Sequence, residues 1–506
     1  MLFRAYCATC VGLEVIPVVV EISVQQGVGI YLVGLPDSAV KESLLRVTTA
    51  LQSCDYRVPG WKTVINLAPA NIRKEGSGYD VAIAVGLLAA SEQIAAPYIQ
   101  DFLILGELAL DGSLRDVPGA LPIALKGKEQ GFSKCIFPCA SALEASEVEG
   151  IKIYGAANIG EVVDILNGED YTNSLVVHPK GEHRGEERSC KADFMDVIGQ
   201  EFAKRGMEIA ASGGHNLILC GVPGSGKSFM ASCLASILPG MSREESLETS
   251  AVYSVAGLLK GRGLIRERPF RTPHNTSSVV AMVGGGPSAY PGEISLAHNG
   301  VLYLDEISLF SASTLDLLRQ PLEERIISIS RAKYKVTYPA SFMLVGSMNP
   351  CPCGYFGDDS GRCTCTPGMI SRYQARISGP LLDRIDLNIK VKPVERDLLV
   401  SGVKGERSED IARRVLRVRE IQLERFKGEG IFTNAQMDAA QLSKYCPLGE
   451  QERAFMGNIM EKLSLSARGY GRILRIARTI ADMEGGKRID ISHISEAVQY
   501  RFNDFL

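Results

Sequence analysis

The sequence predicts a multidomain α/β protein, with a central core built on a parallel sheet, an α+β domain before it and a helical lid after it. First, 506 residues are too many for one hydrophobic core. Second, short apolar strands alternate with helices and glycine-rich loops from residue 193 to 394, the pattern of a parallel sheet with crossover helices. Third, apolar residues recur at helical spacing from residue 395 to 506.

The N-terminal domain is predicted over residues 1–165, where strand-like and helix-like segments alternate. The expected strands are Val15–Val24, Thr63–Leu67, Leu103–Leu105 and Lys134–Pro138, and the expected helices are Ser38–Ser53 and Tyr79–Ser91. Residues 166–192 include a charged, polar run with little to bury, which predicts a linker. In the lid, the helical pattern is carried by Ile411, Val415 and Val418, then by Ile473, Ile476 and Ile480.

Composition and charge exclude several classes of protein. With 45% hydrophobic and 22% charged residues, the chain is neither disordered nor fibrous. Its formal net charge of −3 gives no overall attraction to nucleic acid, so a DNA partner would require a local basic surface. We see no export signal and no apolar stretch near the roughly 20 residues that span a bilayer, and so expect a cytoplasmic protein without a membrane partner.

A complete phosphate-binding loop begins the core. Gly221-Val222-Pro223-Gly224-Ser225-Gly226-Lys227-Ser228 follows an apolar strand, Leu217–Cys220, and precedes a helical segment, Phe229–Leu238. Glycines allow backbone N–H groups to surround phosphates at a helix N-terminus, whose dipole favours anions. Lys227 is expected to reach the β- and γ-phosphates of ATP, and Ser228 to ligate Mg²⁺.

Two carboxylates follow a second buried strand, Val301–Leu304. Asp305 is expected to hold Mg²⁺, and Glu306 to polarise the attacking water. A strand capped by solvated acids is the alternative, and the phosphate loop argues against it. Asn349 ends a third strand, where its amide could orient water or simply form a turn.

Two arginines have open roles at this level. Arg384 lies between Asp383 and Asp386, so a local ion pair is one explanation for it. Arg468 begins a lid helix, from which it could close onto the nucleotide or remain exposed.

The order of these motifs, with Asn349 followed by Cys-Pro-Cys-Gly and then Leu-Leu-Asp-Arg-Ile-Asp-Leu, resembles the ComM family of bacterial magnesium-chelatase-like AAA+ ATPases along the whole chain. The resemblance implies an AAA+ fold and a hexameric helicase that drives branch migration of DNA during recombination in natural transformation. It also implies that Arg384 is an arginine finger for a neighbouring subunit's ATP, that Asn349 is sensor 1 and that Arg468 is sensor 2.

The resemblance extends to three other segments. Val197 and Ile198 match the segment that packs against adenine, although an ordinary entry into the core would have the same sequence. Residues 255–291 and the hairpin-like segment 329–336 match insertions of the magnesium-chelatase branch that could line the pore of a ring. Alternation in the hairpin places Arg331, Lys333 and Lys335 on one face, where they could contact DNA phosphates or be a solvated edge that prevents aggregation.

Four cysteines cluster in the loop 351–365. Cys351 and Cys353 are followed after nine residues by Cys363 and Cys365, a plausible tetrahedral Zn²⁺ set. The single-residue gaps are narrower than those of common zinc sites, so reduced thiols and redox chemistry are alternatives.

Two segments of the N-terminal domain, 73–80 and 106–112, resemble the proteolytic domain of Lon-type proteases, which has a ribosomal-S5-like fold. In that alignment the nucleophilic serine falls at Gly78 and the catalytic lysine at Pro122, so the resemblance implies a scaffold without peptide hydrolysis. Ser77 with Lys74 is the alternative pair.

The sequence therefore favours an ATP- and Mg²⁺-dependent motor that works as a ring on single-stranded or branched DNA. The alternatives are an ATPase subunit of a metal chelatase and an ATPase or protease that remodels proteins.

Overall fold

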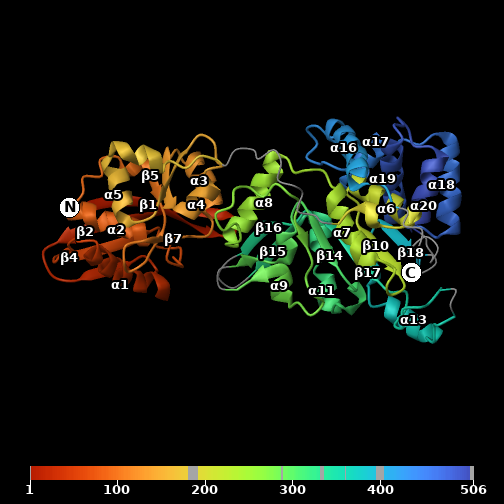
Figure 1. Cartoon of the computed structure of the whole chain (residues 1–506), viewed down its shortest axis with the longest axis horizontal. Helices are drawn as coiled ribbons and strands as arrows, with labels where there is room; N and C mark the ends of the chain where they lie inside the picture. The colour runs from red at the N-terminus through yellow and green to blue at the C-terminus, as the bar shows by residue number, and fades with distance from the viewer. Residues whose placement is uncertain are drawn as a thin grey trace.

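A computed structural model describes residues 2–179, 192–286, 289–330, 335–358, 361–394 and 404–501. The N-terminal domain lies at one end of an elongated molecule, the core occupies the middle, and the lid covers the other end (Figure 1). The mixed α/β architecture with a parallel core sheet is the one expected from the sequence. In the described part of the chain, no helix is both long and apolar enough to cross a membrane.

The N-terminal domain is built on a seven-stranded sheet with the order β3-β4-β2-β1-β5-β8-β9. Apolar side chains of β1, β2 and α2 fill its core, and α2 is buried at every position. The strands are β1 (Leu2–Val11), β2 (Glu14–Gln25), β3 (Ile30–Val33), β4 (Lys62–Ala68), β5 (Phe102–Ile104), β6 (Glu107–Leu108), β7 (Leu114–Arg115), β8 (Lys134–Pro138) and β9 (Lys152–Ala156), and the helices are α1 (Ser38–Ser53), α2 (Asp80–Ala90), α3 (Ala120–Glu129), α4 (Cys139–Ala145) and α5 (Ile159–Asn167).

The predicted linker begins later in the chain than residue 166. Helix α5 continues to Asn167, a 3-10 helix spans Asp170–Leu175, and Val176 forms a bridge with Tyr154 of the edge strand β9. These residues belong to the N-terminal domain because they cover an edge that would otherwise expose unpaired backbone groups. The charged run from 180 to 191 lies outside the described residues.

The core sheet has the order β11-β14-β17-β10-β18, and all of its strands are parallel. Nearly all strand residues are buried, which explains why the sequence shows continuous apolar runs here. The strands are β10 (Leu217–Gly221), β11 (Phe270–Arg271), β14 (Val301–Leu304), β17 (Met343–Met348) and β18 (Leu387–Val391); the helices are α6 (Glu201–Gly213), α7 (Lys227–Ile237), α8 (Arg243–Val255), α9 (Val279–Val283), α10 (Glu293–Leu296), α11 (Ala312–Asp316), α12 (Arg319–Glu324), α13 (Pro367–Gln374) and α14 (Gly379–Leu382).

Two hairpins project from this core, β12–β13 (Gly284–Gly285 with Tyr290–Pro291) and β15–β16 (Ile326–Ser330 with Lys335–Pro339). The lid consists of α16 (Ser408–Arg425), α17 (Ala439–Tyr445), α18 (Glu450–Lys462), α19 (Ala467–Met483) and α20 (Ile491–Arg501). The periodic residues predicted in α16 and α19 are all buried, and all except Val418 belong to one cluster with residues of α6 and α7, so the lid packs directly on the core.

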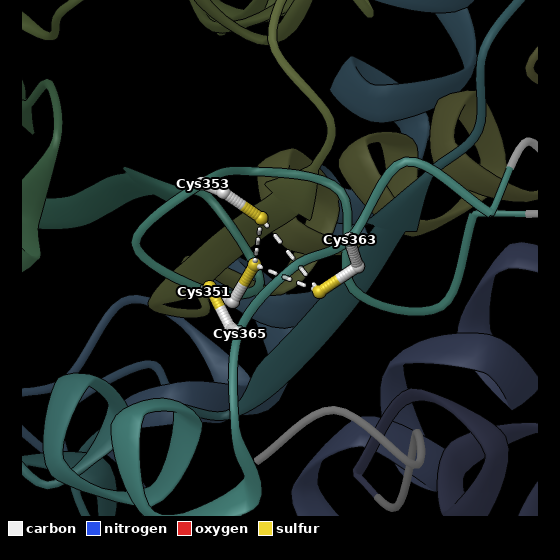
Figure 2. Close-up of side chains that lie close together, drawn as sticks. All are labelled: Cys351, Cys353, Cys363 and Cys365. Atoms are coloured by element: carbon white, nitrogen blue, oxygen red, sulfur yellow. Dashed lines mark hydrogen bonds between the residues drawn. The ribbon is translucent and has the colours of Figure 1, made fainter.

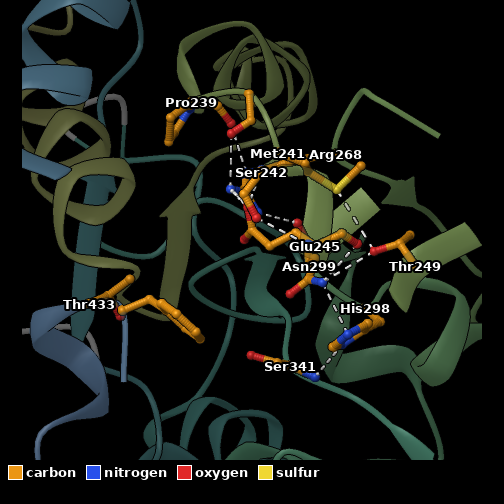
Figure 3. A network of polar contacts seen from close by, with 12 residues as sticks. Pro239, Met241, Ser242, Glu245, Thr249, Arg268, His298, Asn299, Ser341 and Thr433 are labelled. Atoms are coloured by element: carbon orange, nitrogen blue, oxygen red, sulfur yellow. Dashed lines mark hydrogen bonds and ion pairs between the residues drawn. The ribbon is translucent and has the colours of Figure 1, made fainter. Parts of the chain in front are cut away.

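Helix α8 is fixed to the core by a polar network (Figure 3). Arg268 donates to both carboxylate oxygens of Glu245 at 2.9 Å and also to the carbonyl oxygen of Asn299 at 2.7 Å. The Asn299 amide in turn donates to Thr249 at 3.2 Å. Arg271 pairs with Glu293 at 2.7 Å. These two arginines of the predicted pore insertion are therefore used in internal ion pairs.

The N-terminal domain docks on α8 and on the β15–β16 hairpin. The Ser254 carbonyl oxygen of α8 accepts from the N–H of Gly119 at 3.0 Å, and the Ser254 hydroxyl donates to Glu144 of α4 at 3.0 Å. At the hairpin, a Cβ added to Gly12 would lie 2.1 Å from Val336, so only glycine permits this close approach. The domain and the core thus share an interface that includes both α8 and the β15–β16 hairpin.

We expect the contact between α4 and α8 to weaken as pH rises through 7. Burial raises the pKa of Glu144 to about 7, against hydrogen bonds from Ser254 and the Gly261 backbone. Because this folded-state pKa lies above that of an unfolded glutamate, the stabilisation is complete in acid and is lost as the carboxyl ionises. The free energy of unfolding should fall by at most about 1.4 kcal/mol per pH unit between about pH 4.5 and pH 7, and should level off above that range.

Thermal unfolding at about pH 5 and about pH 7 checks this expectation. Glu144→Gln should remove most of the pH dependence because the amide keeps the size and the hydrogen bond from Ser254 without a titrating proton. Glu42→Gln, at an exposed position of α1, is the matched control. An unchanged pH dependence in Glu144→Gln would assign the effect to another group.

Candidate active site

The phosphate loop joins the carboxyl end of β10 to the start of α7. Helix α7 begins at Lys227, and its cap residue Gly226 has φ +90°, a backbone conformation that favours glycine. Gly221 is equally constrained, because an added Cβ would lie 2.3 Å from the Val391 carbonyl oxygen. The strand, loop and helix expected from the sequence are all present, so backbone N–H groups converge where phosphates would bind.

The Lys227 ammonium lies across the loop. It donates to the carbonyl oxygens of Gly221 at 2.7 Å and Val222 at 2.9 Å, and to the Asn349 side-chain oxygen at 3.1 Å. Burial lowers the pKa of Lys227, while nearby anionic groups, including Asp305 and Glu306, oppose the shift. A bound phosphate would add a negative charge beside this partly desolvated ammonium and so stabilise its charged form.

Asp305 and Ser228 come together from different elements. The Ser228 hydroxyl lies 3.3 Å from one Asp305 carboxylate oxygen, which also accepts from Tyr303 at 2.7 Å and from Ser347 at 2.5 Å. Burial raises the pKa of Asp305, but the hydrogen bonds from Ser347, Tyr303 and Ser228 outweigh it and hold the pKa below its usual value. The carboxylate is therefore kept ionised and oriented for a cation.

Tyr303 and Ser347 were not expected from the sequence as site residues. Each lies inside or at the end of an apolar strand and would ordinarily be assigned to the core. Tyr303 precedes Asp305 by two residues on β14, so period-2 alternation was the one signal that could have placed both on the same side of the strand.

Glu306 directly follows Asp305 and has φ +50°, unusual for a residue other than glycine. Its backbone N–H donates to the Ser347 hydroxyl at 3.0 Å, which helps to hold this conformation. The turn leaves the Glu306 side chain exposed at the same edge of the sheet as Lys227.

Val197 and Ile198 lie near this edge as well. Gln200, two residues further along, binds both backbone groups of Lys392, which follows β18 beside the phosphate loop. Val197 is buried and Ile198 half-buried. The position of Val197 and Ile198 is compatible with the predicted contact with adenine, which stays a prediction.

Arg384 lies at the opposite edge of the sheet from Lys227. Its carbonyl oxygen accepts from the side chain of Asn216, which directly precedes β10, at 3.0 Å. The five residues of β10 separate this end from the phosphate loop by about 16 Å, at roughly 3.3 Å per residue. The local ion pair is not formed, because the guanidinium pairs with Glu323 of α12 instead.

Arg468 lines the same cleft as Arg384. This cleft of about 500 Å³ also contains Glu323, Asp386 and Arg472. Arg472 is 7% exposed and has one nitrogen without a hydrogen bond, and burial lowers its pKa to about 10. Arg468 therefore does not lie over the phosphate loop of its own chain. No sequence pattern pointed to Glu323, Asn216 or Arg472, because their roles depend on α12, β10 and α19 meeting here.

The comparisons with known proteins agree with this geometry. Residues 193–399 match the family model for magnesium chelatase subunit ChlI, residues 20–141 match a second model for subunit ChlI, and residues 405–501 match its C-terminal region. The chain is 41% identical to the competence protein ComM of Haemophilus influenzae, covering 98% of this chain and 96% of that protein. The chain belongs to the ComM family.

Two other relatives match this chain, one along nearly its whole length and one over less than half of it. The Escherichia coli protein YifB is 41% identical and covers 98% of this chain and 96% of its own length. The magnesium-chelatase 67 kDa subunit of Chlorobaculum parvum is 27% identical over 44% of this chain and 31% of its own length. Membership in this magnesium-chelatase-like AAA+ family, with the phosphate loop, makes the chain an ATPase that uses ATP and Mg²⁺.

The residues present fit Mg²⁺. Ser228 and the ionised Asp305 offer two oxygen ligands from facing elements, and hard oxygen donors are what this cation prefers. When bound with ATP, the ion neutralises charge on the phosphates.

The four cysteines converge in one cluster after β17 (Figure 2). Their sulfur atoms all lie within 4.8 Å of one another, and the Sγ atoms of Cys351 and Cys353 are 3.3 Å apart. A hydrogen bond from the Tyr355 backbone lowers the pKa of Cys353, which favours the thiolate form that metals bind. The donor set and spacing fit a tetrahedral Zn²⁺ ion.

The N-terminal domain has no serine–lysine pair at the aligned position. Gly78 and Pro122 occupy the expected places of the nucleophile and base. The alternative pair fails as well within the described residues, because Ser77 donates to Glu107 while the buried Lys74 donates to the carbonyl oxygens of Pro69 and Ile72. A lysine bound to two carbonyl groups is not available as a base for Ser77.

The described strands of the β15–β16 hairpin alternate between buried and exposed residues. Ile327, Ile329, Val336 and Tyr338 are buried, and Lys335 is exposed where it pairs with Ser330. Arg331 and Lys333 lie outside the described residues.

Proposed function

We propose that this protein is a ring-forming, ATP-driven motor that moves branched or single-stranded DNA, as a hexameric helicase for branch migration in natural transformation. The observation that carries the proposal is the separation of Lys227 from Arg384 and Arg468 on opposite edges of one sheet. Two arginines that share a cleft far from the phosphate loop suit an active site completed by a second subunit. The name of the Haemophilus relative, competence protein, supports DNA as the substrate.

An ATPase that remodels a protein partner, as in a metal chelatase, is the second candidate. It is favoured by the match to magnesium chelatase subunit ChlI in all three regions of the chain. Stimulation of ATP hydrolysis by forked DNA, together with branch migration of a labelled forked substrate, would support the motor. Hydrolysis that is indifferent to DNA would favour the protein-remodelling reading.

The exposed face of the β15–β16 hairpin is the proposed DNA contact. Lys333→Glu with Lys335→Glu should weaken DNA binding and lower the slope of log K against log salt by about one per lysine that contacts a phosphate. The measurement is fluorescence anisotropy of labelled DNA over a salt series, with ATP binding as the folding check. Lys427→Glu with Lys487→Glu, at exposed lid positions, is the matched charge control. An equal effect in both double variants would remove the hairpin from the proposal.

The cysteine loop is proposed to hold one Zn²⁺ per chain. Elemental analysis of protein purified without chelator should give one zinc per chain, and Cys363→Ser with Cys365→Ser should reduce it to background. Cys139→Ser, an exposed thiol of the N-terminal domain, should leave the zinc content unchanged. Zinc at background in the parent protein would refute the site.

A further inference from the structure

The cysteine cluster is built directly against the phosphate loop. Gly354, between Cys353 and Cys363, lies on Pro223 of that loop so closely that an added Cβ would be 2.6 Å from the Pro223 ring. Gly354 also has φ +87°, so both its space and its backbone conformation require glycine. The proline ring cannot rotate away as a long side chain would, so the two loops restrict each other's positions.

The start of the cysteine loop touches the same site by a second route. Asn349, which accepts a hydrogen bond from Lys227 at 3.1 Å, precedes Cys351 by two residues. Cys351 is completely buried. From the other side, Gln374 of α13 donates to the Pro350 carbonyl oxygen at 3.4 Å. A shift of the cysteine loop would therefore move both Asn349 and Pro223.

No helix or strand holds the described part of the cysteine loop in one conformation. Its described residues, 351–358 and 361–365, form no helix or strand, and Phe356 is 40% exposed. Its side-chain contacts include an Arg362–Asp358 ion pair at 3.2 Å and Arg362 stacked over Tyr355 at 4.2 Å, and the Arg362 side chain in both is exposed. Contacts of an exposed side chain are worth little in water, whereas four metal–sulfur bonds would close the loop.

We infer that zinc in the Cys351–Cys365 loop controls the ATP affinity of the neighbouring phosphate loop, so that the protein binds nucleotide tightly only when the metal is present. This inference rests on the nucleotide site and on the zinc site proposed above. With zinc, Gly354 supports Pro223 and Asn349 stays beside Lys227. Without zinc, ATP binding must order both loops, and the cost of that ordering lowers the affinity. Cys353, Cys363 and Cys365 are half-exposed, so the metal is accessible to exchange.

The coupling predicts a reciprocal change in two affinities. The Kd of a non-hydrolysable fluorescent ATP analogue should rise about 5- to 150-fold in Cys363→Ser with Cys365→Ser. By linkage, a saturating concentration of that analogue should raise zinc affinity by the same factor in the parent protein, measured by equilibrium competition with a chromogenic chelator. Cys139→Ser is the control for both measurements and should match the parent.

Gly354→Ala tests the contact itself. The variant keeps all four cysteines, so it should retain zinc and yet bind the ATP analogue more weakly because its Cβ displaces Pro223. Bound zinc then serves as the evidence that the loop has folded, and a variant without zinc would show that Gly354 is needed to close the metal site against Pro223.

Two results would overturn the inference. One is an unchanged Kd for ATP in the zinc-free double variant, and the other is a zinc affinity that does not respond to nucleotide. If zinc-loaded parent protein bound no nucleotide at all, the nucleotide site itself would be refuted, a failure distinct from the absence of coupling.

Discussion

Glu306→Gln should bind ATP as tightly as the parent protein and hydrolyse it about 10²- to 10⁴-fold more slowly, the range that a positioned general base contributes. The Glu306 carboxylate is exposed at the phosphate edge of the sheet, and its backbone is fixed in an unusual conformation by Ser347. Glutamine has nearly the same shape but cannot accept a proton from water. The substitution therefore removes the chemistry and keeps the site.

Single-turnover hydrolysis, with binding of a fluorescent ATP analogue measured in parallel, checks this result. Glu461→Gln, which removes an exposed carboxylate from α18 in the lid, is the matched control and should hydrolyse ATP like the parent. A Glu306→Gln variant that hydrolysed ATP at the parental rate would assign the base to another residue. Loss of ATP binding would instead show that Glu306 supports the structure of the pocket.

Arg384→Ala should lower ATP hydrolysis by about 10³- to 10⁵-fold, the loss expected for an arginine finger. The guanidinium cannot reach the phosphate loop of its own chain, because β10 lies between them. In the proposed ring, a neighbour presents Arg384 to the ATP of the next subunit. The defect should therefore appear in the shared site and leave ATP binding to the isolated chain intact.

Mixing variant subunits distinguishes an arginine finger that acts on a neighbouring subunit from a structural defect caused by Arg384→Ala. Arg384→Ala and Lys227→Ala are each expected to be inactive alone, but a mixed ring contains interfaces with an intact phosphate loop on one side and an intact Arg384 on the other. Partial recovery of hydrolysis in mixtures is the expected result. Arg413→Ala, a surface arginine paired with Asp410, is the control and should remain active alone. No recovery at any mixing ratio, with both variants assembled, would contradict the shared site.

The positions of Arg384 and Arg468 could not be predicted from the sequence. Arg384 and Arg468 are 84 positions apart in the sequence, and neither has a neighbour in the chain that explains it. The order of the strands decides their place, since the start of β18 lies beside the start of β10 and the lid helix α19 packs over both. Glu323 and Asn216 could not be predicted either, because they contact Arg384 from elements far away in the sequence.

The structure also corrects two other expectations: the linker starts later than predicted, and Ser77 and Lys74 do not form a pair. The charged run predicts a linker over 166–192, and only the exposed edge of β9 explains why residues 170–177 fold against the N-terminal domain. Ser77 and Lys74 are three residues apart, close enough to suggest a pair. The Lys74 ammonium instead donates to the carbonyl oxygens of Pro69 and Ile72, while Ser77 donates to Glu107, which is 30 residues away in the sequence.

By itself, the sequence determined the phosphate loop from Gly221 to Ser228, the strand that delivers Asp305 and Glu306, and the grouping of four cysteines. These features are contiguous, and their chemistry follows from residue type and spacing along a few turns of chain. The tertiary structure alone decided that Arg384 and Arg468 face away from their own phosphate loop and that Gly354 packs against Pro223. Both depend on contacts between segments more than 80 residues apart, and such contacts are set by strand order and side-chain packing.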